Sequence, residues 1–176
     1  DPPKVANIAV VTKEVVANSS PSADAIIRDQ LVAALRGRLD LDFIDPAKAA
    51  SPGVSPASIT NGLSPISSTG DPEADVQALF AAFIAANLSP ASGVFIMSSM
   101  TALALSMRKN PLGQREYPEL SLTGGTFQGL PVIVTEYVPT DSSGSLLILA
   151  NASDIYLGDE GGFAVAMMLK DLKLAQ

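Results

Sequence analysis

The sequence predicts an α+β fold, and three observations support this class. Two long segments carry apolar residues at three- and four-residue spacing, which is the period of one helix face. Several short apolar runs are bounded by Gly, Pro and Ser, as strands commonly are. The elements follow in the order strand, helix, loop, helix, strand, helix and then several strands, without a regular βαβ alternation. This order is typical of a mixed α/β or an α+β fold, and we take α+β as the predicted class.

The first elements lie near the start of the chain. Apolar residues at 5–11 predict a short strand, and 12–16 predict one or two helical turns. Ser20 and Pro21 then begin the first long helix, because Ser is a common N-cap and Pro fits the first helical position. We expect this helix to cover 21–44, a length of roughly 36 Å at about 1.5 Å per residue.

One face of this long helix is apolar. The residues that form it are Ala23, Ile26, Ile27, Leu31, Ala34, Leu35 and Leu39. Gly37 weakens a helix, so we expect a bend there. Pro46 ends the helix, because Pro cannot continue it.

A connector without regular structure is expected at 47–70. It is rich in Ser, Pro and Gly and nearly uncharged. Loops of this length are usually functional or mark a boundary. We therefore expect the connector, and the polar loop at 110–125, on the surface or at subunit contacts.

The second long helix is expected at 71–88. Asp71, Pro72 and Glu73 form a strong start signal, with acids at the cap and in the first turn. Its apolar stripe consists of Val76, Leu79, Phe80, Phe83, Ile84 and Leu88, and alanines at 78, 81, 82, 85 and 86 cover much of the rest. A helix that is apolar on most sides is usually packed on more than one side, so we expect it at the centre of a lobe.

The remaining elements are short strands and a third helix. Strands are expected at 94–97, 130–134, 146–149, 155–157 and 163–169, with a turn-rich segment at 139–144. Ser98 is expected to cap the third helix, with Met100 and Met107 in the core. Arg108 and Lys109 are placed to meet the carbonyl groups of its last turn.

The composition disfavours several kinds of chemistry. The chain contains no Cys and no His, so it offers no disulfide, thiolate nucleophile or structural zinc site, and it lacks the usual proton-transfer residue near neutral pH. Its net charge of −7 and pI ≈ 4.4 disfavour a nucleic-acid-binding surface, which needs clustered Lys and Arg. An acidic face would instead repel DNA.

The chain is also apolar for one without a membrane span. Hydrophobic residues make up 47% of it and charged residues 16%, and its mean hydropathy is +0.30. The most apolar helical segment, 76–88, is too short to cross a bilayer and contains Gln77 and Asn87. We therefore expect no membrane partner, and we expect apolar surface that an oligomer would cover.

Two groups of polar residues invite a chemical interpretation. Ser106 and Lys109 match the S-x-x-K signature of penicillin-binding enzymes, but the K-T-G and S-D-N motifs of that site are absent. Asp40, Asp42 and Asp45 do not share a helix face at this spacing, so a solvated helix end or contacts to a neighbouring chain are favoured over a metal site.

Two glycine-containing segments are also poor candidates for ligand-binding sites. Gly124, Gly125 and Gly129 precede a strand, whereas a phosphate loop follows a strand, so tight turns or close subunit approach are favoured. The acidic turn at 159–162 lacks the alternating oxygen ligands of a calcium loop.

The sequence thus offers no combination of an acid, a base and a nucleophile that would be suited to catalysis. We therefore expect no catalytic, cofactor-binding or metal-binding residue. An unidentified hydrolase that uses Ser98 or Ser106 is the alternative from another class of protein.

Several segments resemble, in their order along the chain, the phage capsid family with the Hong Kong 97 fold. The matching segments are 4–16, 40–44, 95–103, 124–134 and 148–157. In that family a strand ends in a Met-Asn/Ser-Pro-x-Thr-like turn before a helix, which is similar to F-I-M-S-S-M-T-A-L at 95–103. A glycine-rich loop then carries a hydrophobic-x-Gly-x-Pro-Val pattern into a strand, which is similar to G-G-T-F-Q-G-L-P-V-I-V at 124–134. Asn151 departs from the pattern, because the family usually has Gly there.

The resemblance implies a two-lobed fold. Its parts are a peripheral-lobe segment with a spine helix at 1–46, a connector at 47–63, a mixed α/β axial lobe at 64–150, and strands at 151–176 that return toward the peripheral lobe. The family's N-terminal arm and extended loop lie before the first matching segment, and its closing strands continue beyond Gln176. The resemblance therefore implies a fragment.

The resemblance also implies a function without catalysis. The chain is expected to be a structural subunit of an icosahedral phage or prophage head, which self-assembles into hexamers and pentamers and encloses DNA. Its implied partners are copies of itself and head proteins such as scaffold or portal, with no sequence-specific nucleic acid. Its implied location is the virion, after assembly in the bacterial cytoplasm. Encapsulin-like nanocompartment shells share this fold and are the alternative.

Overall fold

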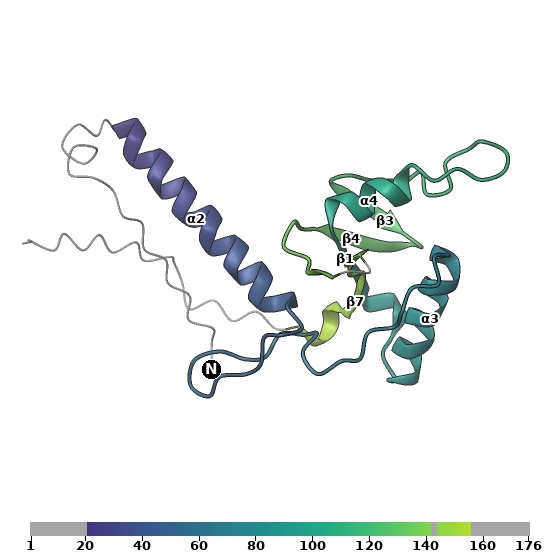
Figure 1. Cartoon of the computed structure of the whole chain (residues 1–176), viewed down its shortest axis with the longest axis horizontal. Coiled ribbons are helices and arrows are strands. Elements are labelled where there is room, and N and C mark those ends of the chain that lie inside the picture. The colour runs from purple at the N-terminus through teal and green to yellow at the C-terminus, as the bar shows by residue number, and fades with distance from the viewer. Residues whose placement is uncertain (1–20, 142–143, 156–176) are drawn as a thin grey trace, which may run out of the picture.

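The computed structural model describes residues 21–141 and 144–155 (Figure 1). The elements expected at 5–11, 12–16, 159–162 and 163–169 lie outside these residues, and only the first residue of the strand expected at 155–157 is described. The described part contains three α-helices and a five-stranded mixed sheet. These elements confirm the α+β class.

Helix α2 covers Pro21–Ile44, as predicted, and continues without interruption through Gly37, where a bend was expected. At this glycine a Cβ atom would lie 2.2 Å from the hydroxyl oxygen of Tyr137. Gly37 therefore allows the segment that contains Tyr137 to approach the helix closely. The sequence pattern gave no sign of this contact.

The apolar face of α2 is only partly covered by the described chain. Ile26 is 58% exposed and Ile44 is 2% exposed, while Leu31, Leu35 and Leu39 are half-buried. Figure 1 shows the reason, since α2 projects away from the sheet and only its C-terminal end reaches the rest of the described fold. Apolar surface is therefore left open along this helix.

The connector at 47–70 has no helix and no paired strand beyond one isolated bridge, and most of it is exposed, as expected. Ser58 and Thr60 are buried exceptions. The Ser58 hydroxyl donates to the carbonyl oxygen of Asp45 at 2.6 Å, and the Thr60 hydroxyl donates to that of Ile44 at 2.8 Å. The last carbonyl groups of a helix lack partners within it, so the connector caps α2.

Helix α3 covers Pro72–Ala85. It begins as predicted, because Asp71 is the N-cap and its carboxylate accepts a hydrogen bond from the Glu73 amide at 3.3 Å. It ends three residues before the expected position 88. Asn87 has left-handed backbone geometry with φ 57°, and such a residue commonly follows a helix end.

The packing of α3 is one-sided in the described chain. Val76 and Phe83 are buried, but Ile84 is 58% exposed, so its assignment to the buried stripe is wrong. Positions 76, 79, 80 and 83 repeat at helical spacing, and 84 lies about 100° further round the axis. The alanines at 81, 82, 85 and 86 are exposed as well. The expected packing on further sides is therefore absent from the described chain.

Strand β1 (Gly93–Met97) is an interior strand of the sheet, whose strand order is β2-β3-β4-β1-β7. It pairs in parallel with β4 (Leu130–Val134) and antiparallel with β7 (Ile148–Asn151). The strands expected at 94–97 and 130–134 are thereby confirmed. The strand expected at 146–149 lies two residues further along the chain.

The other strands replace segments expected to be loops. The expected loop at 110–125 contains β2 (Leu120–Ser121) and the start of β3 (Gly124–Phe127), and β3 pairs antiparallel with β4. The turn-rich segment contains a separate two-stranded pairing of β5 (Thr140–Asp141) with β6 (Gly144–Ser145). Short strands rich in Gly and Ser lack the apolar alternation by which strands are recognised.

Helix α4 covers Ser99–Ser106 and is capped by Ser98, whose hydroxyl oxygen accepts from the Thr101 amide at 3.2 Å. Its buried residues are Ala102, Leu105 and Ser106. Met100 and Met107 are 70% and 64% exposed, so the prediction that they lie in the core is wrong. An eight-residue helix on a sheet buries one face only; Met100 lies on the other face, and Met107 follows the last residue of the helix.

A chain of aromatic rings fills the main core. Phe95, which is fully buried, meets Phe80 edge-on with ring centroids 5.9 Å apart and Phe127 at 5.2 Å. Phe127 in turn meets Tyr117 at 4.9 Å. The rings thereby join α3, the two strands β1 and β3, and the segment before β2.

A second, smaller cluster joins α2 to the sheet. It contains Ile44, Ile96, Val138 and Ala150. Ile44 is the last residue of α2, and Ile96 lies in strand β1. The cluster therefore fixes the C-terminal end of α2 against the sheet.

Candidate functional site

The serine hydroxyls that could act as nucleophiles have structural partners. Ser106 is 6% exposed, and its hydroxyl donates to the carbonyl oxygen of Leu103 at 2.8 Å within α4. Lys109 is exposed beyond the helix end, and among the described residues no hydrogen bond joins its ammonium to Ser106. The Ser98 hydroxyl is the cap of the same helix. The structure does not assemble a nucleophile and a base from these residues.

The basic residues after α4 do not occupy its last turn, which corrects the prediction. The helix ends at Ser106, and its last turn contains no basic residue. Arg108 instead forms an ion pair with Glu116, with 3.0 Å between Nε and Oε2. The guanidinium therefore joins the two ends of the loop that follows α4.

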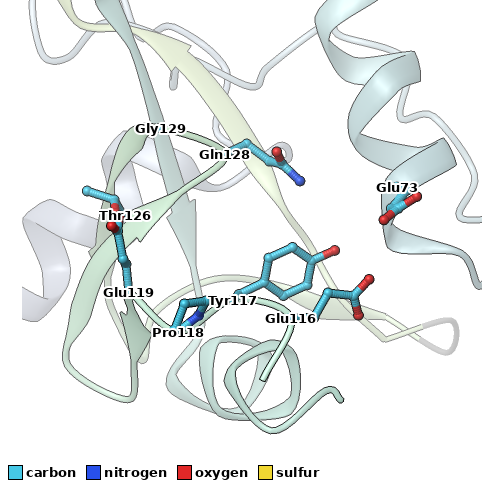
Figure 2. Close-up of a pocket in the computed structure, with 8 residues that line it drawn as sticks. All are labelled: Glu73, Glu116, Tyr117, Pro118, Glu119, Thr126, Gln128 and Gly129. Atoms are coloured by element: carbon cyan, nitrogen blue, oxygen red, sulfur yellow. The ribbon is translucent and has the colours of Figure 1, made fainter. Parts of the chain in front are cut away.

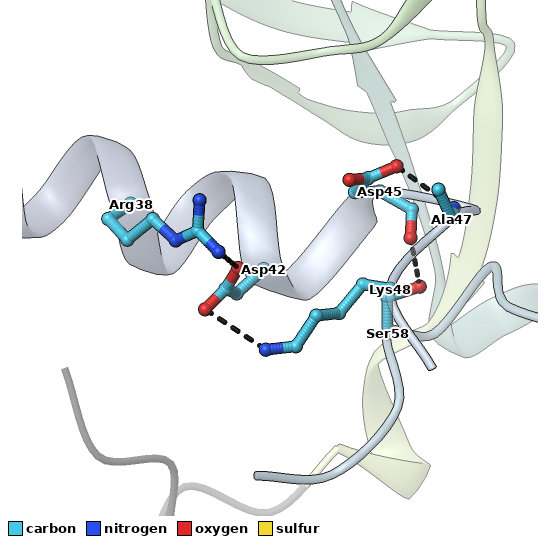
Figure 3. Close-up of polar contacts among 6 residues, drawn as sticks. All are labelled: Arg38, Asp42, Asp45, Ala47, Lys48 and Ser58. Atoms are coloured by element: carbon cyan, nitrogen blue, oxygen red, sulfur yellow. Dashed lines mark hydrogen bonds and ion pairs between the residues drawn. The ribbon is translucent and has the colours of Figure 1, made fainter. Parts of the chain in front are cut away.

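Asp42 is the centre of a small ion-pair group at the end of α2 (Figure 3). Its carboxylate lies 2.9 Å from the guanidinium of Arg38 and 3.2 Å from the ammonium of Lys48. The side chains of Asp42 and Lys48 are 16% and 19% exposed. This group fixes the connector to the helix, because Lys48 belongs to the connector.

The two neighbouring aspartates have separate partners. The carboxylate of Asp45 accepts from the Ala47 amide at 2.9 Å, as Figure 3 shows. The carboxylate of Asp40 accepts from the Thr135 hydroxyl at 3.0 Å. Within the described ranges, no three acidic side chains gather closely enough to hold a metal ion.

The three glycines of the candidate phosphate loop serve strand packing and turns. Gly124 and Gly125 have φ values of 118° and 131°, which other residues rarely adopt. A Cβ atom at Gly125 would lie 2.1 Å from the carbonyl oxygen of Glu119 on the preceding segment. Gly129, with φ 77°, lies in the turn between β3 and β4. These observations support the turn interpretation.

An acidic pocket that the sequence analysis missed lies beside β2 and β3 (Figure 2). Its volume is about 400 Å³, and its walls come from the first turn of α3, residues 116–119 and the β3–β4 turn. Three carboxylates line it, from Glu73, Glu116 and Glu119. They come from two distant segments and form no motif, so only the tertiary structure reveals the pocket.

Tyr117 lies at the centre of this pocket. Its residue is 9% exposed, its ring packs on Phe127, and its buried hydroxyl has no hydrogen-bond partner among the described residues. Burial raises the pKa of Tyr117 above its ordinary value, and the negative charge of Glu116 adds to the shift. The hydroxyl is therefore protonated at neutral pH.

The three carboxylates of the pocket differ in how far they are neutralised. Glu116 is paired with Arg108. Glu119 accepts a hydrogen bond from the Thr126 hydroxyl, and Glu73 forms no ion pair within the described chain. The pocket therefore has excess negative charge beside an unpartnered hydroxyl. Such a site can bind a cationic group that also donates hydrogen bonds.

A second cavity of about 640 Å³ lies between α4 and the β5–β6 pair. Met100, Ala104 and Val138 give it apolar walls, and the Ser145 hydroxyl is buried without a partner in the described part of the chain. Ser98, Arg108 and Glu136 also line it; the Ser98 hydroxyl caps α4, and Arg108 is paired with Glu116. The cavity extends the apolar surface that begins at Met100.

Large apolar residues are exposed on each of the three described helices. They include Ile26 and Phe43 on α2, Ile84 on α3, and Met100 on α4. None of the described helices combines the length and the apolar character that a membrane span needs. Fold and surface together define a class: a folded subunit whose open apolar surface suits contact with other protein chains.

The comparisons with known proteins identify this class more narrowly. The phage capsid family matches residues 1–173, so the chain belongs to the phage capsid family. A curated capsid polyprotein of Pseudomonas phage PAJU2 is 66% identical over 171 residues, which is 95% of this chain and 26% of that protein. No solved structure matches the chain. The family resemblance inferred from the sequence is thereby confirmed.

Proposed function

We propose that this chain is the shell-forming part of a major capsid protein, a structural subunit of an icosahedral phage or prophage head. Copies of it assemble into hexamers and pentamers that enclose DNA. The main supporting observation is the set of exposed apolar side chains on α2, α3 and α4, which the described chain leaves without cover. Burial of apolar area is the main driving force of protein association. Family membership and the 66% identical capsid polyprotein favour a phage head over an encapsulin-like shell.

The proposed fold is of the Hong Kong 97 type. Helix α2 would be the spine helix of a peripheral lobe at 1–46, completed by 151–176, and the axial lobe would cover 64–150 after the connector at 47–63. Two features support this division. Helix α2 projects from the body that contains the sheet (Figure 1), and the cluster around Ile44 and Ile96 joins them.

The proposed partners follow from the same role. Copies of this chain are the main partners, and scaffold or portal proteins of the head are others. The net charge of −7 suits a wall that repels enclosed DNA and does not bind it in a sequence-specific way. We place the protein in the virion after assembly in the bacterial cytoplasm, and we assign it no catalytic role.

Self-association is the direct test of this function. The mass distribution should be measured at rising protein concentration, and the largest species should be imaged by electron microscopy. We expect a shift from monomers to pentamers, hexamers and closed shells. A folded chain that stays monomeric at every concentration would contradict the proposal.

Replacement of Ser106 tests the absence of a catalytic role. The carbonyl oxygen of Leu103 also accepts from the Met107 amide at 3.0 Å, so Ser106→Ala leaves no orphaned acceptor. The free energy of unfolding should fall by about 1 kcal/mol or less, and shell yield should be unchanged. A hydrolytic activity of the parent that disappears in this variant would favour the hydrolase alternative.

A further inference from the structure

The loop that follows α4 is a structured projection. It leaves the body of the fold at Arg108 and returns at Glu116, as Figure 1 shows beyond the end of α4. The side-chain oxygen of Asn110 accepts from the amides of Leu112 and Gln114, both at 3.0 Å. The Glu116 amide donates to the carbonyl oxygen of Arg108 at 3.0 Å, which closes the base. We call residues 108–116 the basic loop.

The basic loop carries two cationic side chains that are not neutralised within the described chain. Lys109 and Arg115 face each other across it in an isolated backbone bridge, and both are exposed. Neither forms an ion pair within the described ranges. Leu112, near the tip, is 84% exposed. A folded loop with two cations and an apolar tip is suited to contact another surface.

The acidic pocket offers the complementary chemistry. Glu73 and Glu119 present exposed carboxylates in this pocket, and the Tyr117 hydroxyl, which is buried and has no partner in the described chain, lies on the side of the ring that faces Glu73 (Figure 2). A buried hydroxyl without a partner costs free energy that a bound donor would recover. A guanidinium has five N–H donors in a planar fork, so one arginine can bind a carboxylate and a hydroxyl oxygen at the same time. The pocket's volume of about 400 Å³ lies within the usual range of ligand pockets.

We propose that the basic loop of one subunit docks on the acidic pocket of a second copy, with Arg115 against Glu73 and Tyr117. This inference rests on the proposed self-assembling function. The loop and the pocket adjoin at Glu116 but otherwise consist of different residues, and we propose that the contact is heterologous, repeated head to tail and not about a two-fold axis. Repeated head to tail, a heterologous contact closes into a ring or continues as a filament. In the proposed shell it lies within a hexamer or pentamer.

Cross-linking between two single-cysteine variants tests the contact, because the chain has no cysteine of its own. Arg115→Cys and Glu73→Cys are made separately, distinguished by a tag, and mixed before assembly. A short bifunctional thiol reagent is used, since a disulfide needs β-carbons closer than a pair of long charged side chains provides. We expect cross-linked dimers in the mixture and none in either variant alone.

Arg36→Cys mixed with Glu73→Cys is the matched control. Arg36 is an exposed arginine on α2 that forms no ion pair within the described chain, and it lies outside the proposed contact. If the parent assembles but the Arg115 mixture gives no more dimer than this control, the docking is overturned and the proposed function stands. If Arg115→Cys alone cross-links as well as the mixture, loops meet loops and the docking is also overturned. A parent that never assembles overturns both.

A charge exchange gives a second, independent readout. Arg115→Glu alone and Glu73→Arg alone should each raise the concentration needed for assembly by roughly tenfold or more, because like charges then face each other. The double variant should restore assembly toward the parent value. Circular dichroism checks that each variant is folded. Folded single variants that assemble like the parent would refute the contact.

Discussion

Phe83 and Ile84 are adjacent large apolar residues on α3, yet they have opposite surroundings. Phe83 is 6% exposed and Ile84 is 58% exposed. One residue is a rotation of about 100° on a helix, and the sheet covers only one side of α3. Burial at the scale of single residues therefore depends on which side of the helix has a neighbour.

The first prediction compares these two residues. Phe83→Ala should lower the free energy of unfolding by about 3–5 kcal/mol, the range for a buried Phe. Ile84→Ala should change it by only about 0.5 kcal/mol in the monomer, as surface substitutions do. Urea unfolding of both variants below the assembly concentration measures the difference. Equal losses in the two variants would show that the two sides of α3 are covered alike.

The second prediction concerns the pH dependence caused by Tyr117. Because its pKa is raised in the folded state, the unfolded chain loses this proton first as the pH rises past about 10. Stability linked to the neutral hydroxyl is thus complete below that value and is lost as the pH rises through the folded-state pKa. Tyr117→Phe should show a smaller loss of stability than the parent between about pH 9 and about pH 11. Identical alkaline slopes in parent and variant would contradict this assignment.

At the scale of elements, the C-terminal end of α2 depends on the connector. The hydroxyls of Ser58 and Thr60 donate hydrogen bonds to carbonyl groups at the end of the helix, and Lys48 forms an ion pair with Asp42. The connector therefore acts as a cap, although it has no regular structure. The same end of α2 carries Ile44 into the second core cluster.

The third prediction tests this cap. Thr60→Val keeps the shape of the side chain but leaves the Ile44 carbonyl oxygen without its hydroxyl donor in a buried place. The free energy of unfolding should fall by about 1–3 kcal/mol. Thr123→Val is the matched control on an exposed threonine, with an expected change within about 0.5 kcal/mol. If both variants melt alike, the connector does not stabilise the helix end.

At the scale of the whole molecule, the described fold is incompletely covered. Its helices carry apolar side chains on both the packed and the open sides, and the alanines of α3 at 81, 82, 85 and 86 are exposed. Small exposed residues allow another chain to approach closely. The open side of α3 is therefore a proposed assembly contact.

The fourth prediction separates folding from assembly. Ile84→Glu should leave the monomer's free energy of unfolding within about 0.5 kcal/mol of the parent value, because this side chain is largely exposed. Shell yield should fall, because a charge would be buried without a partner at the contact. Gln77→Glu adds the same charge at another exposed position of α3 and should assemble normally. Normal shells from Ile84→Glu would remove the open side of α3 from the assembly surface.

The sequence by itself determined the local elements and the family. The start of α3 at Asp71 and Pro72, the cap of α4 at Ser98 and the full extent of α2 follow from capping chemistry and helical periodicity, which act over a few residues. The absence of Cys and His limited the possible chemistry from composition alone. The order of the short motifs along the chain identified the phage capsid family, which the comparisons confirm.

Only the tertiary structure decided which faces are buried and where distant residues meet. Met100, Met107 and Ile84 have the composition of core residues, but no described element covers their side. Tyr117 and Glu73 are far apart in sequence, and only the fold places them in one pocket. Periodicity records the direction in which each side chain points along its own element. Burial and site formation depend on contacts between elements that are distant in the sequence, and local patterns carry no information about them.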